Sequence, residues 1–191
     1  QFRKGNVSVQ KLLLYVQPCM RTMTVLAEIA QNVHRGKLTG GGLLSHLHEK
    51  AMSSIGDARA QELMLHLAQA ASTPYLTMLE SWIYRGVIED PFSEFMVEEE
   101  GRLDKDRVKR HYNDLYWERR YTLRPERTPA FLSKLGDTIL RTGKYLNVMR
   151  ESGKIPQVPA AVDLIYQLRE RAYVDTIERG FQYASRSLLD M

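Results

Sequence analysis

A glycine followed by a lysine can cradle a phosphate group, and the chain has such pairs at 36–37 and at 143–144, among others. A phosphate-binding loop needs Ser or Thr after the lysine and another glycine five residues before the glycine of the pair. At Gly143-Lys144 the next residue is Tyr145, and Thr138 occupies the earlier glycine position. The pair at 36–37 fails at the same Ser/Thr step. Neither pair therefore predicts a nucleotide site.

Three of the five histidines and the single cysteine could ligate a metal or attack a substrate. His46 and His48 lie two residues apart and so face different sides of a helix, and His66 lies further along the chain. Cys19 lies in an apolar stripe, and a thiol without an activating neighbour is a poor nucleophile. The acidic run at 98–100 lacks the alternating oxygen ligands of a calcium loop. The sequence predicts no catalytic residue, no metal site and no cofactor.

Basic and aromatic residues alternate at 98–127, as they do in some RNA-binding grooves. This stretch has nine basic and eight acidic residues, whereas a nucleic-acid groove needs a clear excess of positive charge to neutralise phosphates. Its interleaved aromatic residues are Tyr112, Tyr116, Trp117 and Tyr121. The charge balance favours protein contact or local packing, and RNA binding is the lesser alternative.

The composition excludes several classes of protein. The 191 residues include 43% hydrophobic and 26% charged residues, which is ordinary for a globular domain and argues against disorder or a disulfide scaffold. No stretch approaches the roughly 20 apolar residues that cross a bilayer, so no membrane contact is expected. One cysteine permits no intrachain disulfide, which favours a reducing compartment. The start at Gln1 and the apolar helical pattern that runs to Met191 predict a piece of a longer protein.

The first predicted element is a helix over 8–36, where apolar residues recur every three or four positions. Ser8 can cap its start, and Gly36 can close its end in the left-handed conformation. Pro18 lacks an amide proton and is expected to kink the helix or split it in two. The helix has surplus apolar residues that suit either the core or a protein contact, and the core is the favoured interpretation. They are Leu12, Leu13, Cys19 and Met20.

Three helices are expected between this helix and residue 87. The glycine run at 39–42 predicts a flexible loop before the first of them, and 56–57 breaks and recaps the chain before the second. Thr73-Pro74 is expected to open the third, which Gly86 ends. The expected inward residues are Leu44, Leu47 and Ala51, then Leu63, Leu67, Ala70 and Ala71, then Tyr75, Leu79, Trp82 and Ile83.

The second half of the chain begins with strand patterns. A turn at Asp90-Pro91 followed by alternation at 95–97 predicts a strand, and 120–124 predicts a second that pairs with it antiparallel. A loop and a short helix are expected at 101–118 between them. Two further helices are expected, one opened by Thr128-Pro129 and one from about Ala160. Their expected inward residues are Leu132, Leu135, Ile139, Leu146 and Met149, then Leu164, Ile165, Leu168, Ile177, Phe181, Ala184 and Leu188.

These elements predict a mostly α fold of elongated helical bundles (helical hairpins) with one small antiparallel β-ribbon. The expected divisions are an N-terminal helical bundle at 1–86, a strand and loop insertion at 87–127, and further helices at 128–191.

Four ordered blocks carry a more specific signal than any single motif. They read Trp-Ile-Tyr-Arg-Gly-Val-Ile-Glu-Asp-Pro-Phe-Ser-Glu-Phe-Met at 82–96, Tyr-Asn-Asp-Leu-Tyr-Trp-Glu-Arg-Arg-Tyr-Thr-Leu at 112–123, Pro-Ala-Phe-Leu at 129–132, and Thr-Gly-Lys-Tyr-Leu-Asn-Val-Met-Arg-Glu at 142–151. Together they resemble the γ-tubulin complex component family, in its N-terminal GRIP1 region. The likeness covers nearly the whole chain, and the Tyr-Leu-Asn-Val and Tyr-Trp sequences favour the component-two branch over component three.

The physical character of the signature residues of these blocks predicts an architectural role, because nothing in them requires chemistry. They are Trp82, Gly86, Asp90, Pro91, Phe92, Glu94, Phe95, Trp117, Tyr121, Gly143, Lys144 and Tyr145. We expect Trp82 to be a large apolar anchor, and Phe92, Phe95 and Met96 to pin the strand to the helices. A contact site for another protein is the alternative.

The resemblance also implies a function. Members of the family stand side by side in a ring or cone, pair through their N-terminal halves and hold γ-tubulin with their C-terminal GRIP2 halves, so that the array templates microtubule growth. The chain is thus expected to be a non-enzymatic subunit of the cytoplasmic cytoskeleton, at the centrosome, spindle pole or another microtubule organising centre. Its expected partners are paralogous components, component three above all, and γ-tubulin only through the C-terminal half. A generic helical adaptor is the alternative.

Overall fold

The computed structural model describes residues 8–100, 116, 119–153, 163–168 and 172–190. Its helices are α1 (Val9–Gly36), α2 (Gly40–Ser53), α3 (Ala58–Glu80), α5 (Gly136–Glu151) and α6 (Ala172–Leu189). Shorter helical turns occupy Ser81–Arg85, Pro125–Arg127 and Ala130–Leu135, and the strands are β1 (Val97–Glu99) and β2 (Tyr121–Leu123). The predicted fold class, mostly α with one small antiparallel ribbon, is confirmed.

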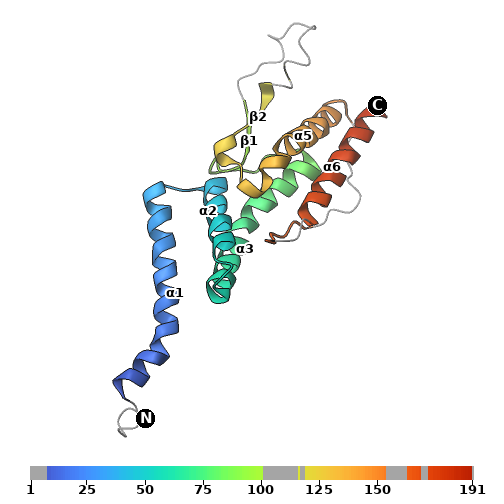
Figure 1. Cartoon of the computed structure of the whole chain (residues 1–191). Helices are drawn as coiled ribbons and strands as arrows, with labels where there is room; N and C mark the ends of the chain where they lie inside the picture. The colour runs from blue at the N-terminus through green and yellow to red at the C-terminus, as the bar shows by residue number, and fades with distance from the viewer. Residues whose placement is uncertain (1–7, 101–115, 117–118, 154–162, 169–171, 191) are drawn as a thin grey trace.

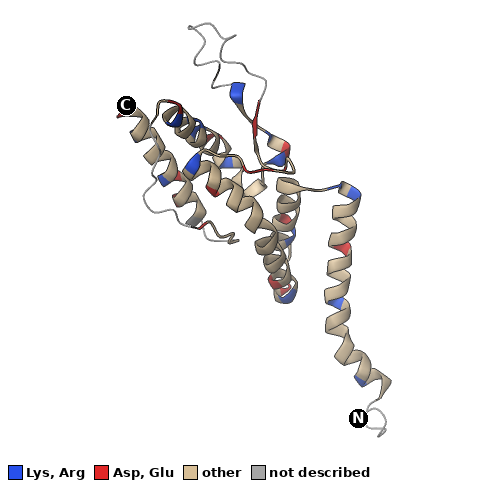
Figure 2. Ribbon diagram, turned by 180° about the vertical axis from the view of Figure 1, so that it is seen from behind, with Lys and Arg blue, Asp and Glu red and all other residues tan. Residues whose placement is uncertain are grey.

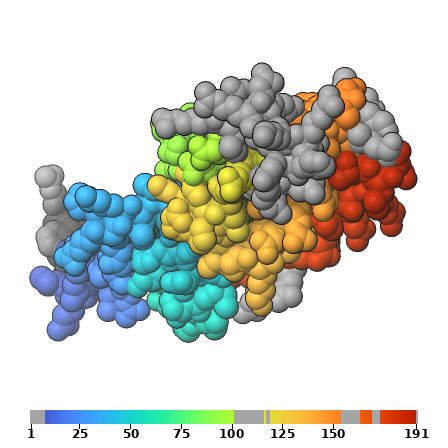
Figure 3. Space-filling view, turned by 90° about the horizontal axis from the view of Figure 1, so that it is seen from above, coloured from blue at the N-terminus to red at the C-terminus, as the bar shows by residue number. Residues whose placement is uncertain are grey.

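The helices form an elongated molecule. α2 and α3 pack as a hairpin, α5 packs against α6, and the turn at Ser81–Arg85 joins the two pairs by packing on α5. α1 extends away from the other helices, and its N-terminal end lies far from α6 (Figure 1). Seen from above, α1 lies at one end of the molecule and α6 at the other (Figure 3).

α1 begins and ends as predicted, but its left-handed cap lies one residue later than expected. The Ser8 hydroxyl accepts a hydrogen bond from Lys11 N at 3.2 Å, which caps the first turn. Pro18 lies inside one continuous helix, which bends in its N-terminal part rather than splitting (Figure 1). Lys37, with φ 46°, takes the left-handed cap that we expected of Gly36, because the last turn continues through the glycine.

The predicted loop at 39–42 is wrong, because α2 starts at Gly40. The glycines let this helix approach the segment after β2 closely. A Cβ atom on Gly41 would lie 1.9 Å from the carbonyl oxygen of Arg127, and one on Gly40 would lie 2.6 Å from that of Glu94. The inward residues predicted for α2 are buried as expected, namely Leu44, Leu47 and Ala51.

α3 is one helix where two were predicted. Asp57 caps it as expected, with its carboxylate accepting from Arg59 N at 3.1 Å and Ala60 N at 3.2 Å. Pro74 does not start a new helix, because both it and Ala70, whose carbonyl loses its amide partner, lie on the exposed side. Before Pro74, the buried residues of α3 lie one position after the predicted stripe and are Met64, Ala68 and Ser72. After it, the buried residues are Tyr75, Leu76 and Leu79. Of the stripe predicted before Pro74, Leu63, Leu67 and Ala71 are half-buried and Ala70 is exposed.

The ribbon forms as expected. β1 and β2 are antiparallel, with Val97 opposite Leu123 and Glu99 opposite Tyr121. Phe95 lies just before the strand rather than in it. The loop and helix predicted at 101–118 lie outside the described residues, apart from Tyr116, which is buried.

The two C-terminal helices start later than predicted. Thr128-Pro129 leads into the tighter helical turn Ala130–Leu135, and α5 begins only at Gly136. Leu135 is half-buried, whereas the other inward residues predicted for this segment are buried, namely Leu132, Ile139, Leu146 and Met149.

The last helix begins at Ala172, not near Ala160. Residues 163–168 form a non-helical strap instead, which is hydrogen-bonded to α3. Glu80 accepts from Leu164 N at 2.5 Å, and Gln69 donates to the carbonyl oxygen of Tyr166 at 3.4 Å. Leu164 is buried as predicted, but Ile165 is 62% exposed, because the segment is not helical and buried and exposed residues alternate along 163–166.

Further along α6, Ile177 and Ala184 are buried as predicted. Leu168 of the strap and Phe181 and Leu188 of the helix are half-buried.

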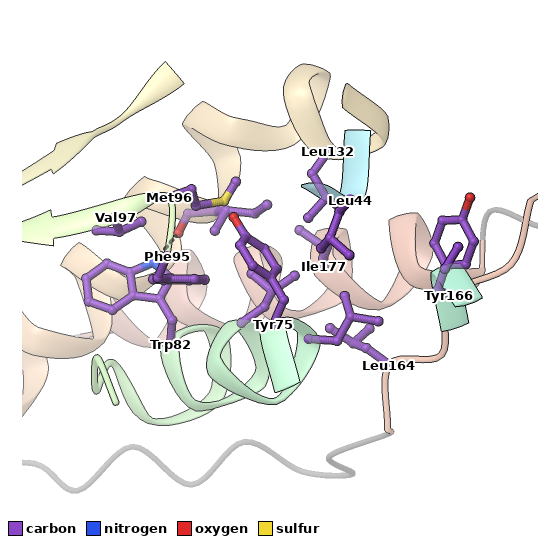
Figure 4. Close-up of a cluster of buried hydrophobic side chains, with 14 of the residues drawn as sticks. Leu44, Tyr75, Trp82, Phe95, Met96, Val97, Leu132, Leu164, Tyr166 and Ile177 are labelled. Carbon is purple, nitrogen blue, oxygen red and sulfur yellow. Dashed lines mark hydrogen bonds between the residues drawn. The ribbon is translucent and has the colours of Figure 1, made fainter. Parts of the chain in front are cut away.

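The main core runs through the middle of the molecule. Trp82, Phe95 and Val97 gather at one end of it, and Leu164 and Tyr166 lie at the other (Figure 4). Its two largest side chains, Trp82 and Phe95, have no exposed surface, and they come from the turn after α3 and from the segment just before β1. Burying side chains of this size is the main source of stability for such a fold.

Candidate functional site

The first and the last of the four signature blocks meet at Trp82 and Gly143. The indole ring lies directly over the glycine, and a Cβ atom on Gly143 would lie 1.9 Å from ring atom Cε2. Trp82 Nε1 donates to the carbonyl oxygen of Ile139 at 2.8 Å, and the ring meets that of Tyr121 edge-on, with 5.0 Å between centroids. Only glycine leaves room for this ring, so the two blocks depend on each other. We call the group formed by Trp82, Gly143, Ile139 and Tyr121 the Trp82 knot.

A second contact between the same two blocks, from Gly86 to Asn147, extends the knot. Gly86 has φ +63°, a conformation that suits glycine, and ends the turn after α3. Asn147 of α5 donates from Nδ2 to the carbonyl oxygens of Gly86 at 2.7 Å and of Gly143 at 2.9 Å. One buried amide therefore ties both glycine backbones together.

Asp90 organises the turn that follows. One carboxylate oxygen accepts from Glu94 N at 3.0 Å and the other accepts from Phe95 N at 2.8 Å. The Arg124 guanidinium lies 3.6 Å from the second oxygen and donates to the carbonyl oxygen of Phe95 at 2.7 Å. The Asp90 side chain is only 5% exposed, so this polar cluster fixes the path of the chain toward the buried Phe95 and Met96.

The expectation that Phe92 pins the strand is wrong, because its side chain is 81% exposed. Pro91, Phe92 and Ser93 form the tip of the turn, between Asp90 and the amides that Asp90 binds. Ser93 has φ 56°, which is uncommon for a residue with a side chain. The closure of the turn by Asp90 thus sends Phe95 inward and leaves Phe92 outside.

The other signature residues have mixed positions. Tyr121 is buried, and burial raises its pKa to about 12. Tyr145 is half-buried and lies 5.9 Å from Phe181, ring to ring, and Lys144 beside it is half-buried too. Glu94 is half-buried against the start of α2. Trp117 lies outside the described residues.

The N-terminal half of α1 has an exposed apolar surface, which sequence reasoning assigned to the core. No residue of α1 is buried except Ile29. The side chains of Leu13 and Met20 are 59% and 53% exposed. We define the α1 face as Leu12, Leu13, Val16, Cys19, Met20 and Met23, all exposed in the part of the chain that the structure describes.

The C-terminal half of α1 holds the helix to the body. Val25 and Val33 pack against the core beside the buried Ile29. Lys50 of α2 donates to the Glu28 carboxylate at 2.5 Å, and this hydrogen bond lowers the pKa of Glu28. The helix therefore has one attached half and one projecting half.

The projecting half is apolar and mildly basic. Residues 9–27 of α1 contain Lys11 and Arg21 and no acidic residue. Few positions along α1 are occupied by charged residues (Figure 2). Contiguous apolar surface on a helix of this kind is typical of a protein contact site.

Of the residues considered for metal binding or nucleophilic attack, His48 is engaged in packing, whereas His66 and Cys19 are exposed. His48 and the hydroxyl of Tyr166 share a hydrogen bond of 2.7 Å, and burial lowers the pKa of His48. Among the described residues no group of three His, Cys, Asp or Glu could hold a metal ion. None of the helices in that part of the chain is long and apolar enough to cross a membrane.

Arg120, the described residue at the centre of the basic and aromatic stretch, is already paired. It contacts Glu99 at 3.0 Å and Glu151 at 2.5 Å, and it donates to the hydroxyl of Tyr116 at 2.9 Å. The two ion pairs of Arg120 join the β-ribbon, through Glu99, to α5, through Glu151. The structure therefore adds no support for a phosphate-binding role of Arg120.

Comparison with known proteins gives consistent matches along the chain. The family model described as gamma tubulin complex component N-terminal matches residues 1–191. Gamma-tubulin complex component 2 of Mus musculus is 53% identical over 188 residues, which are 98% of this chain and 21% of the relative. The gamma-tubulin complex component 2 homolog of Drosophila melanogaster is 38% identical over 191 residues, 100% of this chain and 22% of the relative.

A fungal relative extends the comparison. Spindle pole body component alp4 of Schizosaccharomyces pombe is 33% identical over 162 residues, 80% of this chain and 21% of the relative. The chain thus spans about a fifth of the length of these curated relatives. The resemblance inferred from the four sequence blocks is confirmed, including its component-two branch.

Proposed function

Since the chain belongs to the gamma-tubulin complex component family, we propose that it is a non-catalytic, N-terminal part of a structural subunit of the γ-tubulin complex. In this proposal its task is to hold neighbouring subunits side by side, so that the assembled ring or cone templates microtubule nucleation. The remaining part of the subunit, in its C-terminal half, binds γ-tubulin. The names of the relatives place them in gamma-tubulin complexes and at a spindle pole body, and we propose the same cytoskeletal setting, centrosome or spindle pole, for this protein.

The observation that carries the proposal is the α1 face. Leu13, Met20 and their neighbours are exposed on a helix whose other half is anchored to the body. A helix that is attached at one end and apolar at the other can present a large side surface to a neighbour without disturbing its own core. Burial of that surface would supply the hydrophobic part of a stable subunit contact.

The partner we propose is a paralogous subunit, component three. A related chain with the same helical architecture can pack side by side with this one, as family members do in the assembly that the resemblance implies. The α1 face is then a lateral contact surface, while the Trp82 knot keeps the body rigid behind it.

The test places a charge on the α1 face of the full-length subunit. Two variants of the full-length subunit, one carrying Leu13→Asp and the other Met20→Asp, are each mixed with purified component three. Association is measured by sedimentation velocity. The α1 variants should weaken association at least about tenfold, because each buries a charge in an apolar contact. Ile55→Asp, which alters a 59% exposed isoleucine in the turn between α2 and α3, is the matched control and should associate normally.

A second readout separates contact from folding. Binding of γ-tubulin by the α1 variants and their thermal unfolding should match those of the unmodified protein. Unchanged association of both variants with component three would contradict the lateral role of α1.

A further inference from the structure

The projecting half of α1, residues 9–23, is apolar on more than one side. Residues 12–16 read Leu-Leu-Leu-Tyr-Val, and five consecutive residues of an α-helix point in all directions around its axis. Leu14 and Tyr15 are each 65% exposed, and Leu13 of the α1 face is 59% exposed. A helix that contacts a neighbour on one side only is polar on its other sides. The apolar surface of the projecting half therefore extends beyond the α1 face.

The polar surface of the projecting half is a narrow stripe. Its residues recur at spacings of seven, four and three along the helix, and they are Gln10, Gln17, Arg21 and Thr24, all exposed. At 3.6 residues per turn, Leu13 and Leu14 lie on the two borders of this stripe. A helix that lies on a membrane surface has a broad charged face. A narrow polar stripe favours enclosure within protein instead.

The side of α1 opposite the α1 face borders a hollow. Pro18 and Thr22 line a hollow of about 90 Å³ between α1 and the start of α3, and Leu63 lies on its α3 side. A larger hollow of about 680 Å³, also lined by Thr22 and Leu63, continues along α3. Leu14 and Tyr15 precede Pro18 by four and three residues, so they lie on the same side, one turn further out. We define Leu14, Tyr15 and Pro18 as the α1 inner side.

The charges of the projecting half indicate the chemistry of its partner. Lys11 and Arg21 are basic, and neither forms an ion pair with another described residue. The α3 side of the two hollows has mixed charge, from Asp57, Arg59 and Glu62. The unpaired charge on α1 is thus of one sign. Its complement is an apolar surface with carboxylates at its rim.

We propose that the neighbouring subunit clasps the projecting half of α1 from two sides. One apolar segment of the partner covers the α1 face, a second fills the hollow against the α1 inner side, and carboxylates of the partner face Lys11 and Arg21. This inference rests on the proposed function, since it takes component three as the partner, and it adds a second contact surface. A helix covered on two sides buries more apolar area than a helix covered on one, which strengthens the contact.

The first experiment compares the two sides of α1 in the unmodified full-length subunit. Hydroxyl radicals oxidise exposed side chains, and mass spectrometry gives the rate for each residue in the free subunit and in its complex with component three. Tyr15 of the inner side and Met20 of the α1 face should both lose most of their reactivity in the complex, because both become covered. Met52, a 45% exposed methionine near the end of α2, should react equally in both states.

Three results of this experiment would overturn the clasp. Protection of Met20 without protection of Tyr15 would leave a contact on the α1 face alone. If Tyr15 of the dilute free subunit reacted as slowly as Tyr75, which is 2% exposed, the subunit's own remaining chain would cover the inner side. Protection of Tyr15 that rises with the concentration of the free subunit alone would assign the cover to a second copy.

The second experiment adds a charge to each side in turn. Leu14→Asp and Tyr15→Asp should each weaken association with component three at least about tenfold in sedimentation velocity, as Leu13→Asp does on the α1 face. Gln10→Asp, which places the same charge on the exposed polar stripe, is the matched control and should associate normally. The melting temperatures of the free variants should stay unchanged, and a lowered value for the inner-side variants would overturn the clasp, because the subunit itself would then cover these residues.

The outcomes separate this inference from the proposed function. Normal association of the inner-side variants with weakened association of Leu13→Asp overturns the clasp and leaves the lateral role of α1 intact. Normal association of Leu13→Asp with weakened inner-side variants overturns the clasp too, because only one side is then covered. Normal association of all three variants contradicts both proposals.

The carboxylates of the partner are tested through salt dependence. Lys11→Gln combined with Arg21→Gln should weaken association at low salt, and the difference from the unmodified subunit should disappear at high salt, because screening removes the attraction between exposed charges. Equal association at low salt, or a loss that does not depend on salt, would contradict carboxylates at these positions.

Discussion

The Trp82 knot and the α1 face have similar sequence patterns and opposite environments. Both lie on helical segments whose apolar residues recur every three or four positions. Trp82 has no exposed surface and fits against a glycine of another helix, whereas Leu13 on α1 is 59% exposed. The period of a sequence shows which side of a helix is apolar, but the tertiary contacts decide whether that side is covered within the same chain.

The same contrast occurs over a shorter distance within the signature. Phe92 and Phe95 lie three residues apart, yet one is 81% exposed and the other is fully buried. The difference comes from Asp90, which closes the turn between them. A signature block therefore contains residues that build the fold and residues that the fold presents to the outside.

The largest expected effect is on the buried side of the comparison. Trp82→Ala should lower the free energy of unfolding by about 3–5 kcal/mol, because it removes a buried indole and its hydrogen bond to Ile139. Chemical denaturation of the chain measures the change. A shift near zero would mean that Trp82 is not the centre of the core, and Ile165→Ala is the exposed control.

Gly143→Ala tests the fit of the ring on the glycine. The new methyl group would overlap the indole, so stability should fall by about 1–3 kcal/mol. In the double variant Trp82→Ala with Gly143→Ala, the methyl group enters the space that the indole leaves, so the two losses should sum to more than the loss measured for the double variant. Strictly additive losses would show that the two residues are independent.

Asp90→Ala tests the turn between the buried and exposed phenylalanines. The amides of Glu94 and Phe95 lose their acceptors, and we expect a loss of about 1–2 kcal/mol. Glu89→Gln, at the exposed neighbouring position, should be nearly neutral in the same denaturation experiment. If the two variants were equally stable, the turn would not depend on the Asp90 carboxylate.

The smallest expected effect is on the exposed side of the comparison. Leu13→Ala should change the free energy of unfolding by less than about 0.5 kcal/mol, as exposed positions generally do. Leu79→Ala, the matched change at a fully buried leucine of α3, should cost about 2–5 kcal/mol. Equal losses at the two leucines would show that the α1 face is covered within the chain.

Sequence reasoning recovered the local features of the fold. The helix caps at Ser8 and Asp57, the end of a helical segment at Gly86 and the antiparallel ribbon all follow from residue type and short-range spacing. These features depend on a few neighbouring residues, which the sequence displays directly.

Features that depend on tertiary contacts were missed. Pro74 stays within α3 because its exposed side tolerates the lost hydrogen bond, and the glycines at 40–41 start a helix because another segment packs closely on them. The signature residues could be recognised from the sequence. That Gly143 must lack a Cβ atom because the ring of Trp82, far away along the chain, packs on it could not be recognised. Nothing in the local pattern separates Phe92 from Phe95, since the closure by Asp90 is a feature of the folded turn.

The most direct test of the central claim uses Cys19, the single cysteine of this chain, which is exposed on the α1 face. The rate at which a maleimide alkylates Cys19 is measured by mass spectrometry of its peptide, in the free full-length subunit and in its complex with component three. A lateral contact through α1 predicts rapid labelling of the free subunit and strong protection in the complex. Equal labelling rates in the two states would contradict the account.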